Sequence, residues 1–166
     1  MLLKLIKLVL RSIFTFKIHR KVKGCGQHLK VNFYSSVNSN TVLGDNVNFN
    51  GLRIYGGGNV FIGNNFHSGK GCRFITSFHN YDAGIAIPYD NTSINKDIII
   101  KDNVWLGMDV MVLGGVTLGE GCIIQAGSVV VSDIPDCAIA GGHPAKVFKY
   151  RDIRHYEELK LSKCFN

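Results

Sequence analysis

The sequence predicts an all-β solenoid, in which the chain winds into stacked triangular coils with a helix at each end. From residue 31 onward, apolar side chains recur every six residues, and a second register runs two residues ahead. Four segments repeat nearly the same letters in phase: LGDNV at 43, IGNNF at 62, IKDNV at 100 and LGEGC at 118. A period of six matches neither the 3.6-residue turn of a helix nor the alternation of an amphipathic strand.

Each six-residue unit is expected to be a short strand followed by a tight turn. Three such units close a coil of 18 residues, and coils stack at the inter-strand spacing of about 4.8 Å. Inward side chains have to be mostly aliphatic because stacking removes the axis of the solenoid from water. The turns favour Gly, Asn and Asp, which tolerate positive φ. Packed β-hairpins with coincidental spacing are the alternative, which two persistent registers disfavour.

Two sets of positions are therefore expected to point inward. The first set has a one-residue slip after Tyr55 and an interruption after Phe74. It comprises Val31, Val37, Leu43, Phe49, Tyr55, Ile62, Ser68, Phe74, Ile100, Leu106, Val112, Leu118, Ile124 and Val130. The second set comprises Ile98, Val104, Val110, Val116, Cys122, Ser128 and Ile134.

Residues 1–23 are expected to form a basic amphipathic helix, in which Lys4, Lys7 and Arg11 share one face at i, i+3 and i+7. Residues 1–30 hold eight Lys and Arg and no acid, whereas the remaining chain holds 11 basic and 12 acidic residues. Such a local charge disfavours nucleic-acid binding. The helix either packs on its own domain or a neighbouring subunit, or makes peripheral contact with the anionic inner membrane. We expect a cytoplasmic protein, in the second case on the cytoplasmic face of that membrane.

The hexads divide the chain into a β-helix domain over 24–150 and a short helical tail over 151–166. An excursion loop over 77–97 interrupts the coils, and long excursions from regular folds are usually functional. The five cysteines are odd in number and none has C-x-x-C spacing. We interpret them as buried thiols in a reducing cytosol, not as a zinc site or a disulfide framework.

The ordered pieces DNVWLG, VTLGEG, QAGSVV, SDIP and GGHPAKV over the C-terminal coils resemble the hexapeptide-repeat acyltransferases. The nearest group is the bacterial sugar and polysaccharide O-acetyltransferases, of the galactoside, maltose and colanic types. The resemblance covers roughly residues 25–150. It implies a left-handed parallel β-helix, a homotrimer with inter-subunit active sites, and acetyl-CoA as co-substrate.

The resemblance also implies roles for individual residues. His79 matches the general base at the start of the excursion loop, and Asn80, Asp82, Asp90 or a backbone carbonyl could orient it. The positions implied to bind the cofactor are Met108, Ala126, Val131, Ser132, Lys146 and Lys149. The positions implied to contact the acceptor are Asn50, Asp82 and Trp105. Related enzymes often read Thr-Lys where this chain has Val131 and Ser132, so the phosphate contacts differ. A core role for Trp105 and a merely solvated surface for the two lysines are the alternatives.

The predicted function is acetyl-CoA-dependent O-acetylation of a sugar hydroxyl in capsule, O-antigen or exopolysaccharide assembly. A hydroxyl is a poor nucleophile near neutral pH, and a His with a pKa near 6.5 can take its proton during attack on the thioester. A lipid-linked or nucleotide-linked glycan would explain the basic N-terminus better than a free galactoside. The alternatives are an amino sugar, serine or streptogramin acceptor, or a non-catalytic or metal-binding β-helix. A metal site needs three histidines, and only His67 and His79 are suitably placed.

Overall fold

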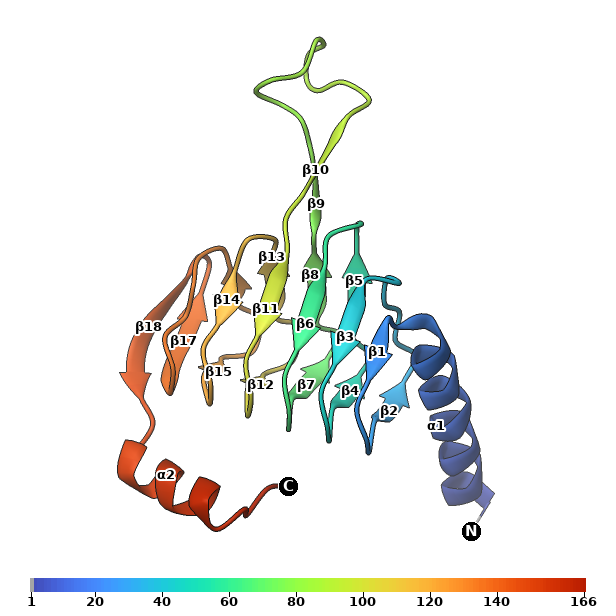
Figure 1. The fold of residues 1–166 in the computed structure, drawn as a ribbon, viewed down its shortest axis with the longest axis vertical. Helices are drawn as coiled ribbons and strands as arrows, with labels where there is room; N and C mark the ends of the chain where they lie inside the picture. Colours follow the sequence, from blue (N-terminus) through green and yellow to red (C-terminus); the bar gives the residue numbers. More distant parts are fainter. Residues whose placement is uncertain (1) are drawn as a thin grey trace.

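The computed structural model describes residues 2–166 and shows a parallel β-solenoid of about six coils. The coils stack side by side, with α1 (Leu2–Lys21) along the first coil and α2 (Ile153–Leu161) beyond the last (Figure 1). The predicted N-terminal helix over 1–23 includes Met1, which lies outside the described residues.

Three parallel sheets form the sides of the triangular coils. Sheet A contains β1 (Gly24–Cys25), β3 (Thr41–Leu43), β6 (Val60–Ile62), β11 (Ile98–Ile100) and β14 (Thr117–Leu118). Sheet B contains β2 (Lys30–Phe33), β4 (Asn48–Asn50), β7 (His67–Lys70), β12 (Trp105–Leu106), β15 (Ile123–Ile124), β17 (Ala138–Gly142) and the antiparallel β18 (Ala145–Tyr150). Sheet C contains β5 (Arg53–Tyr55), β8 (Arg73–Ile75), β13 (Met111–Leu113) and β16 (Val129–Val130).

The two predicted registers form the core. In the C-terminal half, every inward position from Ile98 to Ile134 is at most 3% exposed. One prediction is wrong: Tyr55 is 44% exposed, and Ile54 points inward in its place. The turn at Gly51, with φ of 91°, is one residue shorter than a regular turn, and the turn after Tyr55 is two residues longer. The one-residue slip is therefore the sum of two irregular turns.

Asparagines with positive φ build the turn between sheets A and B. Asn46, Asn65 and Asn103 have φ values of 54°, 55° and 61° in successive coils. Their side chains form a ladder, in which Asn46 Nδ2 donates to Asn65 Oδ1 at 3.1 Å and Asn65 Nδ2 donates to Asn103 Oδ1 at 2.8 Å. Each side-chain amide donates a hydrogen bond to the side-chain oxygen of the asparagine in the next coil. The turns therefore stack in register, as the hexad pattern predicts.

Helix α1 covers the open end of the first coil through its C-terminal half. Ile18 is 3% exposed, and the ring of Phe14 meets that of Tyr34 edge-on at a centroid distance of 6.2 Å. The Val31 amide, which has no preceding coil to pair with, donates to Thr15 Oγ1 at 3.1 Å. The helix thus packs on its own domain, while apolar side chains of its N-terminal half, such as Leu2 and Leu5, stay exposed.

All five cysteines are free thiols. Cys72, Cys122 and Cys137 are buried as predicted, and burial raises the pKa of Cys122 to about 12. Cys25 is only half-buried, and Cys164 is exposed because the C-terminal tail lies outside the coils, so the prediction is corrected for these two residues. Within residues 2–166, no helix is both long and apolar enough to cross a lipid bilayer.

Truncation of a core residue tests the solenoid directly. Leu106 is fully buried in a central coil, so Leu106→Ala should lower the free energy of unfolding by about 2–5 kcal/mol, measured by chemical denaturation. Ile99, which is 43% exposed on the outer face of sheet A, provides the matched control, and Ile99→Ala should cost much less. Equal losses in the two variants would contradict the inward register.

Candidate functional site

A polar stripe crosses the outer face of sheet B. We call it the sheet B stripe and define it as Asn32, Asn50, His67 and Trp105, which come from the successive strands β2, β4, β7 and β12. Asn32 Nδ2 donates to Asn50 Oδ1 at 2.9 Å, and Asn50 Nδ2 lies 3.3 Å from His67 Nε2. His67 pairs in register with Trp105. The structure therefore brings two predicted acceptor residues, Asn50 and Trp105, to one face.

The hydrogen bonds around Asn50 define the state of His67. Asn50 Nδ2 donates to the Ser68 carbonyl at 2.7 Å while its Oδ1 accepts from Asn32, so the orientation of the amide is set. His67 Nε2 is then an acceptor, and the proton of the neutral ring lies on Nδ1. Partial burial lowers the pKa of His67, which also favours the neutral ring.

Trp105 and His67 form one wall of a cavity of about 490 Å³, which we call the tail cavity. The other wall is α2 and the C-terminal tail, including Leu159, Lys160 and Phe165. Trp105 is 50% exposed, so the alternative that it is a core aromatic is wrong. A half-exposed indole in a cavity wall offers an apolar ring and a hydrogen-bond donor to a ligand.

A partly buried polar cluster holds α2 in place. Tyr156 donates its hydroxyl proton to Glu120 Oε1 at 2.9 Å and accepts from Asn103 Nδ2 at 2.9 Å. Lys160 Nζ lies 2.5 Å from the same carboxylate oxygen of Glu120. Gly121 has no side chain to obstruct the Tyr156 ring, since a Cβ there would lie 2.7 Å from it. The tail then runs back along the coils, and the Asn166 carbonyl accepts from Asn46 Nδ2 at 2.8 Å.

The excursion loop carries His79 at the end of β9 (Ser77–His79), which pairs with β10 (Ser93–Asn95) in an antiparallel hairpin. The imidazole of His79 stacks on the ring of Tyr89, with centroids 3.7 Å apart and an interplanar angle of 11°. Within residues 2–166, neither ring nitrogen of His79 has a hydrogen-bond partner in the chain. The contact that orients His79 is therefore the Tyr89 ring.

The three side chains considered for orienting His79 have other roles or none. Asp90 accepts from the Thr92 hydroxyl and from the Thr92 and Ile85 amides, and the Thr92 hydroxyl bond is the main cause of its lowered pKa. Asn80 Nδ2 donates to Thr92 Oγ1 at 3.1 Å. Asp82 is exposed. Asn80 and Asp90 thus shape the loop on which His79 and Tyr89 meet.

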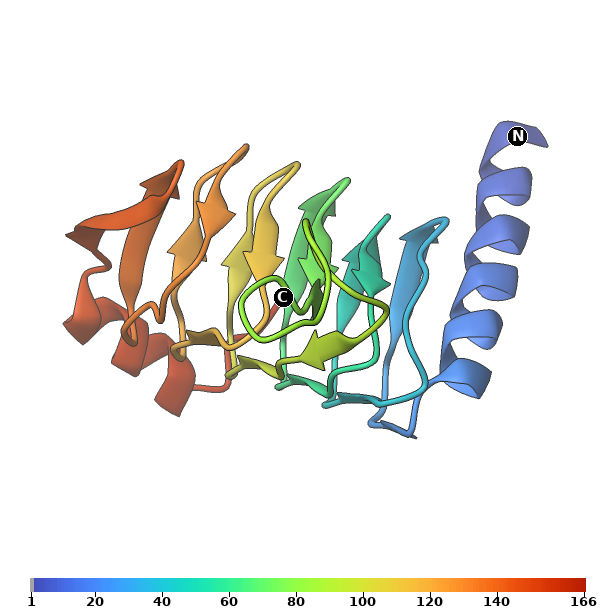
Figure 2. The same cartoon turned by 90° about the horizontal axis from the view of Figure 1, so that it is seen from above.

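The loop and the sheet B stripe lie on opposite sides of one chain. The loop leaves from β8 in sheet C and returns to β11 in sheet A, so it springs from the edge of the prism opposite sheet B. Figure 1 shows it projecting away from the coils, and in Figure 2, which looks from that side, it lies in front of the middle coils. A single chain consequently does not bring His79 or Asp82 to Asn50 and Trp105.

The predicted cofactor residues lie along the last coils. Met108 and Ala126 stack directly at the turn between sheets B and C, where Gly127 donates to the Met108 carbonyl at 2.8 Å. A Cβ on Gly107 would lie 2.5 Å from the Ala126 nitrogen, so only glycine permits this close stacking. Within the described part of the chain, the amides of Met108 and Ala126 donate no hydrogen bond.

The other predicted cofactor residues lie elsewhere on the last coils. Val131 and Ser132 follow β16 at the far edge of sheet C, and both are exposed. Lys146 and Lys149 lie on β18, where Lys146 pairs with Gly141 and Lys149 with Ile139. Both lysines are exposed, and neither forms an ion pair with another described residue. The amide pair and the cations thus lie along one end of the solenoid.

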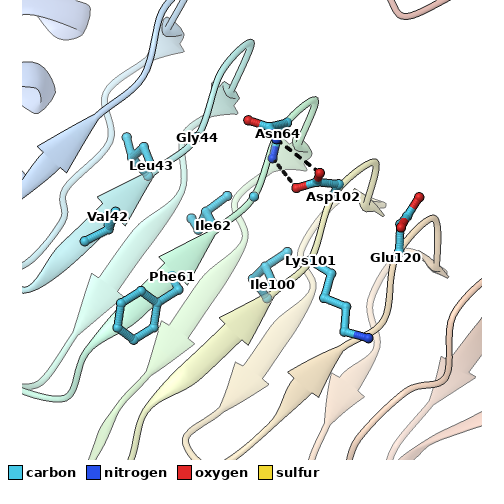
Figure 3. Close-up of a pocket in the computed structure, with 11 residues that line it drawn as sticks. Val42, Leu43, Gly44, Phe61, Ile62, Asn64, Ile100, Lys101, Asp102 and Glu120 are labelled. Atoms are coloured by element: carbon cyan, nitrogen blue, oxygen red, sulfur yellow. Dashed lines mark hydrogen bonds between the residues drawn. The ribbon is translucent and has the colours of Figure 1, made fainter. Parts of the chain in front are cut away.

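A second hollow of about 490 Å³ lies on the outer face of sheet A (Figure 3). Val42, Phe61 and Ile100 line it, together with Asn64, which donates to Asp102 at 3.1 Å. None of the predicted site residues contributes to it. No three or more His, Cys, Asp and Glu residues between 2 and 166 are grouped so that they could hold a metal ion.

Sequence reasoning considered His67 only as a metal ligand, not as a neighbour of Asn50 and Trp105, and it did not single out Tyr89. His67 precedes the inward Ser68 just as Trp105 precedes the inward Leu106, so both occupy the same outward position of the hexad. This shared position could have indicated that the two side chains lie side by side. Tyr89 carried no signal, because the loop has no repeat from which a contact could be inferred.

Comparison with known proteins identifies the repeat. A family model described as bacterial transferase hexapeptide (six repeats) matches residues 97–132. The galactoside O-acetyltransferase of Lactococcus lactis is 35% identical over 118 residues, which cover 69% of this chain and 56% of that enzyme. The chain spans 41–59% of the lengths of this enzyme and two further curated relatives.

Solved structures are similar over most of the chain. A galactoside acetyltransferase in complex with coenzyme A has a TM-score of 0.72 and 28% identity, covering 84% of this chain and 70% of that one. A hexapeptide-repeat acetyltransferase from Vibrio cholerae in complex with acetyl-CoA has a TM-score of 0.69 and 28% identity, covering 80% and 73%. Repeat, coil geometry and sequence agree: residues 97–132 match the bacterial transferase hexapeptide family, and the chain is similar in sequence and fold to hexapeptide-repeat acetyltransferases.

Proposed function

We propose that this protein transfers an acetyl group from acetyl-CoA to a hydroxyl of a sugar, with His79 as general base. The observation that carries the proposal is the turn at Met108 and Ala126, whose two amides are free to donate on a solenoid similar to CoA-bound acetyltransferases. The exposed His79, oriented by Tyr89, supplies a base on the excursion loop.

The chain's residues suit the parts of acetyl-CoA. The Met108 and Ala126 amides can donate to amide carbonyls of its pantetheine arm, and Lys146 and Lys149 can meet its phosphates as point charges. Val131 and Ser132, which follow β16, are exposed and carry no charge. The co-substrate supplies an acyl group activated as a thioester, so the chain needs no nucleophile of its own.

His79 performs the proton chemistry. Its imidazole accepts the proton of the sugar hydroxyl as the oxygen attacks the carbonyl carbon. The tetrahedral oxyanion that forms needs an N–H donor about 3 Å away. When the carbon–sulfur bond breaks, the imidazolium returns the proton to the departing sulfur, so the base is regenerated. Neutral His67, with Asn50 and Trp105, orients the acceptor on sheet B.

A second copy of the chain completes the site. His79 and the sheet B stripe diverge within one chain, so the loop has to reach a neighbouring copy. Its tip is apolar and uncovered, with Ile85 97% and Ile87 99% exposed. Burying these side chains against an adjoining protomer would stabilise the assembly by about 1.5–3 kcal/mol for each. We infer a homotrimer in which the loop of one subunit brings His79, with Asp82 beside it, to the acceptor on the next.

The setting that we propose is glycan assembly for capsule, O-antigen or exopolysaccharide at the cytoplasmic face of the inner membrane. The N-terminal half of α1 combines exposed Leu2, Leu5 and Val9 with cationic side chains and no acid. That combination favours an anionic lipid surface.

Replacing the base should abolish turnover without unfolding the protein. His79→Gln should reduce acetyl transfer from acetyl-CoA by about 10²–10⁴-fold, because no other group takes the hydroxyl proton. The assay measures CoA release against a panel of sugar, amino-sugar, serine and streptogramin acceptors. The control is His155→Gln on α2, which should retain full turnover. Full turnover by a folded His79→Gln trimer would remove the catalytic assignment.

His67 should titrate below its ordinary value in the folded protein. Because the folded pKa is lowered, the unfolded chain binds the proton more readily. The contribution of His67 to stability is complete above the unfolded pKa of about 6.5 and declines as pH falls through the folded pKa. Nitrogen NMR should find Nε2 unprotonated at pH 7, and His67→Gln should remove this part of the pH dependence of unfolding. A His67 ring protonated on both nitrogens at pH 7 would refute the neutral acceptor role.

The membrane contact should depend on exposed apolar residues of α1. Leu5→Gln combined with Val9→Gln should reduce sedimentation of the protein with vesicles containing anionic phospholipid. Leu161→Gln on α2 is the control, since Leu161 is 81% exposed yet distant from α1 in sequence. Equal sedimentation of both variants and the unaltered protein would exclude the contact.

A further inference from the structure

Where α1 meets sheet B, a third cavity opens, which we call the α1 cavity. Its volume is about 350 Å³, within the range of small-ligand pockets. Three cationic side chains of the helix line it, together with an apolar residue of the helix and an amide and an aromatic ring of β2. These residues are Lys4, Lys7, Arg11, Leu8, Asn32 and Phe33.

The positive charge of this cavity is not neutralised by the chain. The sequence has no acid before Asp45. The ion pairs formed among residues 2–166 involve Lys101, Arg154 and Lys160, and none of the cations of the α1 cavity. Like charges three and four residues apart on a helix repel one another, so a bound anion would relieve a local penalty.

The α1 cavity adjoins the sheet B stripe and shares one residue with it. Asn32 lines the cavity, and its Nδ2 donates to Asn50 Oδ1 at 2.9 Å. Phe33 in the cavity wall is 53% exposed, and Lys70 Nζ lies 5.7 Å from its ring centroid. A ligand lying along the outer face of sheet B can therefore occupy the stripe and the cavity together.

We propose that the α1 cavity binds a diphosphate attached to the acceptor glycan. This inference rests on the proposed acetyltransferase function and names the class of its acceptor. Lys4 to Arg11 spans about 10 Å of helix at 1.5 Å per residue, so the cations form a row. A diphosphate presents two adjacent anionic groups to such a row, whereas the carboxylate of an acidic sugar presents one. Arg11 can bind phosphate oxygens bidentately, and the lysines act as point charges.

The arrangement gives the acceptor a direction. Its diphosphate end lies at α1, its first sugar ring lies near Phe33 and Asn50, and the hydroxyl to be acetylated lies toward His67 and Trp105. Both nucleotide-linked and lipid-linked glycans carry such a diphosphate, and the cavity contacts only the group that they share.

Binding of inorganic pyrophosphate tests the cavity without any turnover. Titration calorimetry is performed on the full chain with saturating CoA and without vesicles, so that Lys146 and Lys149 are occupied and lipid is absent. Lys7→Gln combined with Arg11→Gln should weaken pyrophosphate binding by about tenfold or more, because charge-assisted hydrogen bonds are lost. The matched control is Lys17→Gln combined with Arg20→Gln, which removes two charges elsewhere on α1. Equal affinities in both variants, or no binding by the unaltered protein, would overturn the proposal.

Steady-state kinetics then distinguish nucleotide-linked from lipid-linked acceptors, and they test the α1 cavity separately from the acetyltransferase function. The Lys7 and Arg11 variant should raise KM for a nucleoside diphosphate sugar or a polyprenyl diphosphate glycan far more than KM for a neutral glycoside, with kcat unchanged. The diphosphate substrate with the higher kcat/KM in the unaltered protein identifies the source. A raised KM for acetyl-CoA in place of the acceptor would overturn the cavity assignment. The two proposals can also fail separately. If the unaltered protein binds pyrophosphate and the variant does not, but the unaltered protein acetylates no acceptor, the acetyltransferase function is refuted and the anion site remains supported.

Discussion

The stacking of inward side chains along one axis is the constraint on which the rest of the structure depends. Each coil buries two side chains per face, and the residues above and below in neighbouring coils complete their packing. A coil therefore has to close in about 18 residues, and its corners have to fall over those of its neighbours. The asparagine ladder at Asn46, Asn65 and Asn103 and the close approach of Gly107 to Ala126 are consequences of that register.

The same constraint explains where function can lie. Since the interior is filled with side chains, chemistry is confined to the outer faces, the corners and the interruptions of the repeat. Sheet B presents His67 and Trp105 in register in adjacent coils, and a register shift between Asn48 and Asn50 lets the Asn50 side chain reach His67 from the preceding coil. The excursion loop is free of that register and projects away from the coils, with His79 at the end of β9. The helices at the two ends then bound this face with the α1 cavity and the tail cavity.

The sequence predicted the coils well because their physics is local and repeated. Ile100, Leu106 and Val112 could be placed inward from spacing alone, whereas Tyr55 could not, because two compensating irregular turns are invisible in a count of sixes. Only part of the sheet B stripe was predicted. Asn50 and Trp105 were predicted as acceptor contacts from the family resemblance, whereas the role of His67 became visible only from the residues that lie next to it in the structure. The stacking of His79 on Tyr89 and the return of the tail to Asn46 depend on segments without a repeat. No pattern in the sequence could place them.

The central claim is that one chain supplies the base and the next supplies the acceptor face. Co-expression of a His79→Gln chain with a His67→Ala, Trp105→Ala chain tests it most directly. Each chain alone should be nearly inactive, whereas trimers that contain both should regain acetyl transfer, because some interfaces then combine an intact His79 with an intact stripe. Mixed trimers no more active than the average of the two separate variants would contradict the account.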